Sequence, residues 1–389
     1  MPRTSHTHSC LAPMRLLLPL ALLCVLLSWV ASACRSPNSE NESGEHTSVG
    51  SRGQALNLQV DAARQSSAGR QFVELELESL PLGKTAPGSG DAPPLGVYTP
   101  SKVRLRGDSL FCVLDRGSYQ VKAFRYDGHP AATYGKGQGR GPGEFLNPVD
   151  FVVGAEGDVH VLDMGNQKIS AFDARGHHLG DYSIPRAQQL IRTGEGRLAL
   201  MHLSSDHLFS TLTRTMETGD EFGVLIEDQR ALGLTLHGFA TQKASRIAYV
   251  NASTGDLAVF THDGKLVYYT KGIDNQELPG LKRIEYESQA GRALDLPDDA
   301  KQYGPIITST DNRLYYWVDP RSEPGYIDVY SVQDGRYIRS LRFEDRCGPL
   351  AITRDELLAT CRGDLTLFRY EPDLTTHLSG KDETPTELR

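Results

Sequence analysis

The 389-residue chain lacks the features that mark several common classes of protein. Its body contains no cluster of lysine and arginine of the kind that neutralises phosphate groups. Its formal net charge is −8, which also argues against nucleic-acid binding. Past residue 34 no stretch shows sustained helical periodicity with capping residues, apart from an ambiguous patch near residues 285–300. No G-x-S-x-G motif of a hydrolase nucleophile is present.

The one long apolar run lies at the N-terminus and is typical of a secretory signal. Arg15 precedes an almost uninterrupted apolar run over residues 16–30, and the segment Ala31-Ser32-Ala33 follows it. A basic residue, an apolar region of up to about 15 residues and an A-x-A end are the parts of such a signal. A membrane-spanning helix needs roughly 20 apolar residues. We therefore interpret residues 1–33 as a signal peptide.

Cys34 stands directly after the A-x-A end, and the segment resembles the lipobox of bacterial lipoproteins. The resemblance implies that Cys34 is lipidated and holds the protein to the lipid bilayer, at the outer membrane or the cell surface. Ala31 stands where the motif usually has leucine, so plain cleavage after Ala33, which gives a secreted soluble form, stays open. Residues 34–70 are polar and rich in Ser, Gly and Glu, so we expect a flexible tether there.

The chain past residue 70 has the patterns of an all-β protein. "FVELELESL" (residues 72–80) alternates apolar and acidic residues, as a half-buried strand does. Two later segments, "LFCVLDRGSYQVKAFRYDG" and "VHVLDMGNQKISAFDARG", place Asp115 and Asp163 at the end of a β-type run, 48 residues apart. Weaker echoes of this pattern bring the number of units to six. A repeat of 40 to 50 residues indicates a propeller or a solenoid.

The second of these units carries the clearest motif, and it resembles the blades of NHL-repeat β-propellers. The residues that match the family pattern are Gly139, Pro142, Gly143, Phe145, Pro148, Val161, Asp163, Asn166, Lys168, Ile169 and Phe172. With its lipoprotein-type signal, the whole chain also looks like bacterial six-bladed propeller lipoproteins of unknown function.

This resemblance implies an all-β fold, a six-bladed β-propeller of four-stranded antiparallel blades, over residues 71–372. Closing the ring requires a strand from the other end of the chain, because an open ring would leave exposed sheet edges. We predict that residues 71–80 complete the last blade beside the strand near Thr366–Tyr370. The polar residues 373–389 then form a peripheral tail, and the protein is expected to be monomeric.

The glycine-rich stretch "GQGRGPGEF" (residues 137–145) resembles a phosphate-binding loop only in its composition. A strand rather than a helix is expected after it, and no lysine-threonine pair ends it, so we interpret it as a link between two blades. Asp115 and Asp163 allow two interpretations. They are either ligand-binding carboxylates or, as we prefer, acceptors for the N–H groups of tight turns.

Cysteine usage fits an oxidising compartment. Cys347 and Cys361 flank a predicted hairpin centred on Arg354, which places them opposite each other if the register is regular. A cross-strand disulfide and two separate thiols both remain open. Cys112 lies within an apolar run and is expected to be a buried residue without a catalytic role.

Turns between the second and third strands of a blade gather on one face of a propeller, together with the links between blades. On that face we expect a set of basic, amide and aromatic side chains that could receive an acidic peptide or a glycan: Arg116, Tyr119, Arg140, Asn166, Gln167 and Lys168. Such residues are also the ordinary content of solvated turns. Both interpretations stay open.

Two hypotheses for function follow. The first is a non-catalytic, lipid-anchored binding or scaffolding module of the cell envelope, with a protein, peptide or glycan as partner and no cofactor. The second is an extracytoplasmic metal-dependent hydrolase, lactonase or lyase with its site at the channel mouth, for which calcium is the expected metal. Four histidines were considered as metal ligands, and they share no position in the repeat: His160, His202, His237 and His262. No metal site is therefore predicted.

Overall fold

The computed structural model describes residues 69–80, 96–106, 110–203, 205–243, 245–286, 289–320, 324–343, 347–361 and 364–370. These ranges form strands β1 to β27 and two short 3-10 helices, η1 (Gly194–Gly196) and η2 (Gly233–Leu236). The ambiguous patch near residues 285–300 contains strand β20 (Gln289–Asp295), and the described part of that patch has no helix. The predicted all-β fold is confirmed.

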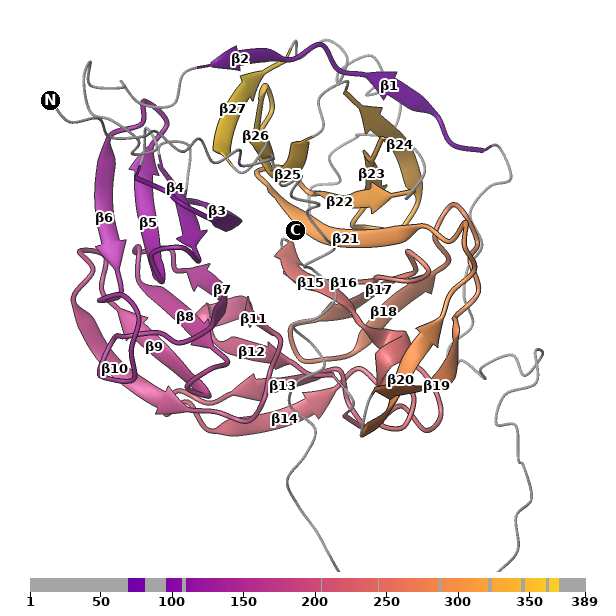
Figure 1. Cartoon of the computed structure of the whole chain (residues 1–389), viewed down its shortest axis with the longest axis horizontal. Coiled ribbons are helices and arrows are strands. Elements are labelled where there is room, and N and C mark those ends of the chain that lie inside the picture. The colour runs from indigo at the N-terminus through magenta and orange to yellow at the C-terminus, as the bar shows by residue number, and fades with distance from the viewer. Residues whose placement is uncertain are drawn as a thin grey trace, which may run out of the picture. The chain divides into compact units, whose positions relative to one another are not determined.

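The first four blades are four-stranded antiparallel sheets, each with its strands in sequence order and its first strand nearest the centre of the ring (Figure 1). The first blade has β3 (Pro100–Arg106), β4 (Leu110–Asp115), β5 (Gln120–Arg125) and β6 (Pro130–Tyr134), and the second has β7 (Pro148–Val153), β8 (Val159–Asp163), β9 (Lys168–Phe172) and β10 (His178–Ser183). The third has β11 (Gln189–Arg192), β12 (Leu198–Met201), β13 (Phe209–Leu212) and β14 (Thr218–Phe222), and the fourth has β15 (Gly238–Lys243), β16 (Arg246–Asn251), β17 (Leu257–Thr261) and β18 (Leu266–Thr270). Asp115 and Asp163 end the second strand of adjacent blades, as the 48-residue repeat predicts.

The ring closes at the sixth blade, which combines strands from both ends of the chain. The fifth blade has β21 (Gln302–Ser309), β22 (Arg313–Asp319), β23 (Tyr326–Ser331) and β24 (Tyr337–Arg342), and the sixth begins with β25 (Cys347–Ile352), β26 (Glu356–Cys361) and β27 (Asp364–Arg369). Its fourth strand is β2 (Glu78–Leu80), which runs antiparallel to β27 with Ser79 opposite Phe368. The predicted closure by an N-terminal strand is confirmed, and it covers an edge that would otherwise be exposed.

Strand β1 (Phe72–Glu74) departs from that prediction, because it pairs with the fifth blade rather than the sixth. It runs parallel to β24, with Val73 opposite Leu341. The apolar side of "FVELELESL" explains the difference: Val73, Leu75 and Leu77 pack on one core cluster that draws on both blades. The segment therefore crosses the seam between the fifth and sixth blades, and each of its ends adds a strand to a different blade (Figure 1).

The cores of the propeller lie between adjacent blades. In the seam between the first and second blades, Phe145 is fully buried beside Cys112 of β4 and Phe172 of β9. Its ring meets that of Phe172 edge to face at 6.1 Å. Burying such a side chain contributes about 1.5–3 kcal/mol, so the glycine-rich link also fastens two blades together.

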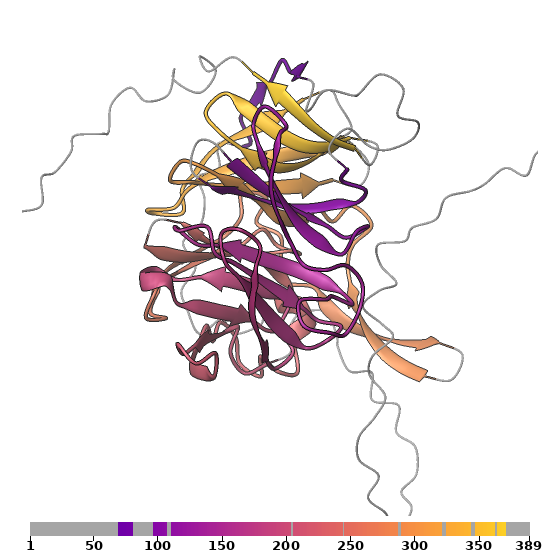
Figure 2. The same cartoon turned by 90° about the vertical axis from the view of Figure 1, so that its left-hand side faces the viewer.

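One insertion interrupts the regular ring. Strands β19 (Gly280–Tyr286) and β20 form a two-stranded antiparallel hairpin between the fourth and fifth blades. Figure 2 shows this hairpin projecting from the ring. Among the described residues it is the one sheet with fewer than four strands.

Candidate functional site

Asp115 is a fully buried carboxylate that organises the turn after β4. Its Oδ1 accepts the backbone N–H groups of Thr99 (2.8 Å) and Gly117 (3.1 Å). Its Oδ2 accepts the Ser118 hydroxyl (2.6 Å) and the Lys122 ammonium (2.8 Å). Burial alone would raise the pKa of Asp115, but these donors outweigh it and hold the pKa below its usual value.

Asp163 occupies the equivalent place in the second blade and binds equivalent groups. Its Oδ1 accepts the N–H groups of Asn147 (2.8 Å) and Gly165 (3.0 Å), and its Oδ2 accepts the N–H of Leu146 (3.0 Å) and the Asn166 side-chain amide (2.7 Å). Because these partners fill the lone pairs of each carboxylate, both aspartates act as turn acceptors, which is the interpretation we preferred.

The glycine-rich link is a folded loop attached to the second blade. Gly137 and Gly143 have φ of 100° and 72°, a region that favours glycine. The Asn166 amide donates to the Gly139 carbonyl (3.0 Å), and the Lys168 ammonium donates to the Gly141 carbonyl (3.1 Å). The loop is therefore held by side chains of the turn that follows β8 and of β9.

Asp181 on β10 completes this attachment. Its carboxylate pairs with Lys168 (2.9 Å) and accepts the Ser170 hydroxyl (2.6 Å) and a hydrogen bond from His178 (2.8 Å). Burial by itself would raise the pKa of Asp181, but these three partners lower it to about 2. The charge of Lys168 is thus neutralised by a carboxylate of its own blade.

The six side chains predicted for a partner face divide into two groups. Asn166 and Lys168 bind the loop, as described above, and Tyr119 packs half-buried against the core of the first seam. Arg116, Arg140 and Gln167 are exposed, and Arg116 donates to the side-chain oxygen of Asn147 (3.1 Å). Tyr119 and Gln167 share a positive φ, 54° and 51°, which shows that the two turns have the same shape.

Cys347 and Cys361 lie opposite each other on β25 and β26. Of the two alternatives that the sequence left open, the structure has the disulfide, with an S–S distance of 2.06 Å and a sequence separation of 14. Cys112 is a buried free thiol, and burial raises its pKa to about 12. It therefore stays protonated and unreactive at neutral pH.

The central channel contains a charged group that the sequence reasoning missed. Lys102 and Arg104 on β3 both pair with the buried Asp150 of β7, at 3.1 and 3.0 Å. The second oxygen of Asp150 accepts the N–H of Leu190 (3.1 Å). The sequence does contain a sign of this group, because Asp150 is a charged residue within the otherwise apolar strand "PVDFVV". The repeat pattern alone does not explain a charged residue at that position.

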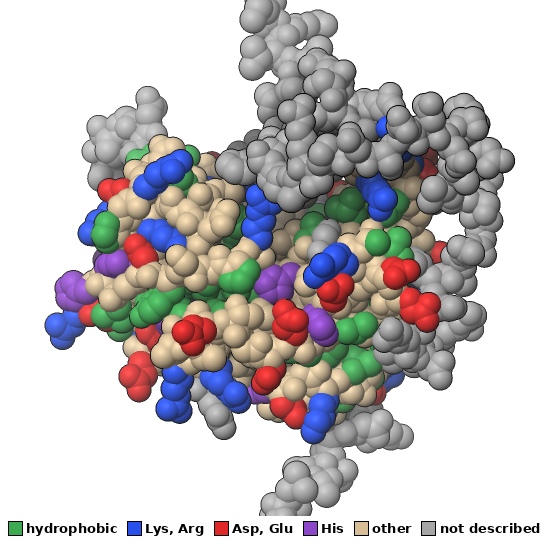
Figure 3. All heavy atoms as spheres, turned by 90° about the horizontal axis from the view of Figure 1, so that it is seen from below, with side chains coloured by type: hydrophobic (Ala, Val, Ile, Leu, Met, Phe, Trp, Pro, Cys, Tyr) green, Lys and Arg blue, Asp and Glu red, His purple; other side chains and the backbone are tan. Residues whose placement is uncertain are grey.

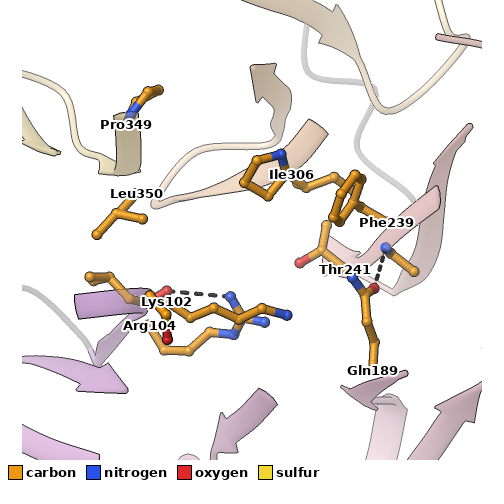
Figure 4. A pocket seen from close by; sticks show the side chains of 12 residues that line it. Lys102, Arg104, Gln189, Phe239, Thr241, Ile306, Pro349 and Leu350 are labelled. Atoms are coloured by element: carbon orange, nitrogen blue, oxygen red, sulfur yellow. Dashed lines mark hydrogen bonds between the residues drawn. The ribbon is translucent and has the colours of Figure 1, made fainter. Parts of the chain in front are cut away.

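A small pocket lies among the side chains that line this channel. Figure 4 shows Lys102 and Arg104 on one side and Phe239, Ile306 and Leu350 around them. The open space is about 20 Å³, which holds about one water molecule. Burial lowers the pKa of Lys102, while Asp150 opposes that effect and Arg104 adds to it.

The four candidate histidines belong to three blades, His160 to the second, His202 to the third, and His237 and His262 to the fourth. His160 has a side chain that is 20% exposed, with its nearest carboxylate oxygen, of Asp158, at 3.6 Å. His202 contacts a backbone carbonyl and a serine hydroxyl, and His237 packs against an aromatic ring. Within the described ranges no three His, Cys, Asp or Glu side chains are grouped to hold a metal ion.

Figure 3 shows basic and acidic side chains interspersed over one side of the molecule.

Comparisons with known proteins agree with this architecture. Residues 97–254 match a family model described as a 6-bladed β-propeller. No curated protein has a sequence that matches this chain. The structure agrees with the family description, with four blades as separate four-stranded sheets and the fifth and sixth blades within one nine-stranded sheet, so the chain is a six-bladed β-propeller.

Solved structures with similar folds have low sequence identity. One is a Bacteroides fragilis protein described as exported, with 12% sequence identity and a TM-score of 0.53. The alignment covers 79% of this chain and 98% of the Bacteroides fragilis chain. A Bacteroides vulgatus protein of the duf4221 family is 12% identical, with coverage of 77% and 98% and a TM-score of 0.47. A virginiamycin B lyase from Staphylococcus aureus is 10% identical, with coverage of 76% and 99% and a TM-score of 0.45. At 12% identity the likeness to the Bacteroides fragilis protein concerns the fold alone.

Four predictions from the sequence concern residues outside those described. The signal peptide (1–33), Cys34 and residues 34–68 of the predicted tether precede residue 69, and the predicted polar tail follows residue 370. The tether ends earlier than residue 70, because Arg70 is buried in ion pairs with the ring. The part of the chain that the structure describes includes no helix long and apolar enough to cross a membrane.

Proposed function

We propose that this propeller is a lipid-anchored, extracytoplasmic binding or scaffolding module of the bacterial cell envelope. Cys34 is the proposed lipid attachment, and the partner is a protein, peptide or glycan. The signal-like N-terminus supports export, and the exported description of the Bacteroides fragilis protein with the same fold agrees with it. Lipid attachment would place the ring beside a membrane surface.

One observation carries the binding hypothesis: exposed polar side chains stand on turns that buried carboxylates hold rigid. Arg116 follows Asp115 directly, and Gln167 lies in the turn that Asp163 organises. Arg140 lies on the loop that Asn166 and its neighbours attach to the second blade. Rigid presentation lowers the entropy lost on binding, so these three exposed residues suit the recognition of an acidic partner.

A pull-down from the native envelope tests this face. We expect the full chain to capture a partner and the charge-reversed variant Arg116→Glu/Arg140→Glu to lose it. The matched control, Arg125→Glu/Arg175→Glu, changes two exposed arginines at the other end of the third strands of the same two blades. Equal capture by both variants would contradict the assignment of this face.

Two further measurements separate the remaining alternatives. Cys34→Ser should release the protein from the membrane fraction, and unchanged partitioning would rule out the lipid anchor. Metal analysis of protein purified without chelator addresses the enzyme alternative. Stoichiometric calcium or zinc would favour a metal-dependent hydrolase or lyase over a binding module.

A further inference from the structure

A second cavity lies away from the channel, where the N-terminal segment (residues 70–80) crosses the fifth blade. Its volume is about 340 Å³, which is within the usual range for small-molecule sites. Its walls come from three parts of the chain: Arg70 and Phe72 from the N-terminal segment, Asp299 and Lys301 from the residues before β21, and Pro320, Tyr326 and Arg342 from the fifth blade. It is distinct from the proposed partner face in the first two blades.

Arg70 forms a rigid wall of this cavity. Its side chain is 9% exposed and lies between two carboxylates. The guanidinium donates to Asp274 at 2.6 and 2.7 Å and to Asp328 at 3.1 and 2.7 Å, and it stacks over the Tyr326 ring at 4.7 Å. Because four hydrogen bonds engage this guanidinium, it fixes the shape of the cavity rather than serving as the main ligand donor.

Arg342 and Lys301 retain donors that can reach a ligand. The Arg342 guanidinium lies over the Phe72 ring at 3.8 Å and is 3.6 Å from the Glu74 carboxylate, beyond hydrogen-bond distance. Its side chain is 37% exposed. The Lys301 ammonium has Asp274 as its hydrogen-bond acceptor, which uses one of its three donors. The cavity therefore presents cationic donors from two different parts of the chain, strand β24 and the residues before β21.

The remaining walls add an acceptor and an apolar surface. Asp299 is exposed and lines the cavity with a carboxylate. Phe72 and Tyr326 meet edge to face at 5.2 Å, beside Pro320. A ligand that suits all of these walls carries an acid, a hydroxyl donor for Asp299 and a C–H surface.

We propose that this cavity binds a carboxylate-bearing sugar unit, of the uronic-acid type. The sugar carboxylate binds Arg342 and Lys301, a ring hydroxyl donates to Asp299, and the C–H face packs against the aromatic and proline wall. The nearby carboxylates of Asp274, Asp328 and Glu74 balance the cations. Long-range attraction is therefore small, and affinity should depend only weakly on salt.

Calorimetric titration of the full chain with digalacturonate tests the proposal. We expect millimolar or tighter binding, with weaker binding of neutral galactobiose, inorganic phosphate and glutamate. Arg342→Gln and Lys301→Gln should each reduce the affinity at least about fivefold, because each removes a charge-assisted hydrogen bond. The controls are Arg336→Gln, an exposed arginine of the same blade, and Lys282→Gln on the hairpin.

Several results would contradict the proposed sugar site. Absence of binding at millimolar digalacturonate, or equal loss in the control variants, would overturn the proposal. Phosphate or glutamate binding as tightly as the sugar would overturn the sugar assignment. Thermal unfolding of each variant shows whether it is folded, and Asp299→Asn, which keeps the size of the side chain, tests the hydroxyl contact separately. No change of digalacturonate affinity in Asp299→Asn would contradict the proposed sugar orientation.

Discussion

Two irregular segments are attached to the ring by side-chain hydrogen bonds, but over very different separations along the chain. The loop of residues 137–145 is held by side chains 27 residues away, in the blade that follows it. The N-terminal segment is held through Arg70, whose partners Asp274 and Asp328 are 204 and 258 residues away. Donors to backbone carbonyls thus fix a local loop in one case, and an arginine between two carboxylates ties the N-terminal segment to the ring in the other.

The difference shows which contacts a repeat can reveal. The loop belongs to a pattern that recurs from blade to blade, so Asp115 and Asp163 share their type of partner as well as their position. The contact of Arg70 with Asp274 and Asp328 occurs once, and the three residues belong to parts of the chain that share no sequence pattern. Its loss should also be more damaging, because it connects three parts of the chain rather than two.

The largest effect is expected from Arg70→Ala. This change leaves Asp274 and Asp328 without their shared cation, and breaking a buried pair in this way costs about 3–5 kcal/mol in the free energy of unfolding. Urea unfolding measures it. The exposed Arg116→Ala is the control and should change stability by no more than about 0.5 kcal/mol. Equal stability of the two variants would contradict the structural role of Arg70.

The disulfide in the sixth blade gives the next effect. The double variant Cys347→Ala/Cys361→Ala removes a bridge with a sequence separation of 14. Loop-closure entropy for a loop of this size corresponds to about 3 kcal/mol. Calorimetric unfolding of the variant should show a lower Tm. Cys112→Ala, which leaves the bridge intact, is the control for loss of a thiol. A variant as stable as the parent would show that the sixth blade does not need the bridge.

The loop should be affected more locally by Asp163→Ala. The change leaves three backbone N–H groups and one side-chain amide without their acceptor, and we expect a loss of about 2 kcal/mol. Hydrogen exchange should rise in residues 137–147 and stay unchanged in the N-terminal segment. A rise spread over the whole ring would mean that the loop also supports closure. Asp115→Ala should act in the same way on the turn of the first blade.

Acid should weaken both attachments in the same pH window. Asp181 and Asp274 each have a pKa of about 2 in the folded protein, below the usual value of about 3.9. For a carboxyl group whose pKa is depressed by folding, the stabilisation is complete above about pH 4 and is lost as the pH falls toward 2. We expect at most about 2 kcal/mol from Asp274 and less from Asp181, whose carboxylate is more exposed to solvent.

The measurement is urea unfolding at several pH values between about 5 and 2. The variants Asp181→Asn and Asp274→Asn should each reduce the steepness of the decline. If neither variant changes the slope, other carboxyl groups are responsible for the acid sensitivity.

Much of the fold could be predicted because it depends on short patterns. Alternation in "FVELELESL" identified the buried side of the N-terminal segment, and Leu75 is buried while its acidic neighbours are exposed. Spacing between equivalent aspartates indicated the blades. The partner face was harder to predict. Of its six residues, Asn166 and Lys168 bind the loop instead of facing a partner. In the sequence, a turn residue that faces a backbone carbonyl looks the same as one that faces solvent.

The sequence by itself determined the β content and the blade repeat, because each depends on residues close together in the chain. It also indicated closure by an N-terminal strand, because a ring of blades cannot leave its last sheet edge open. Only the tertiary structure decided that β1 joins the fifth blade, that Arg70 lies between Asp274 and Asp328, and that a cavity forms beside it. The physical reason is that single contacts over more than two hundred residues leave no periodic trace in the sequence. They arise from which surfaces meet when the ring closes.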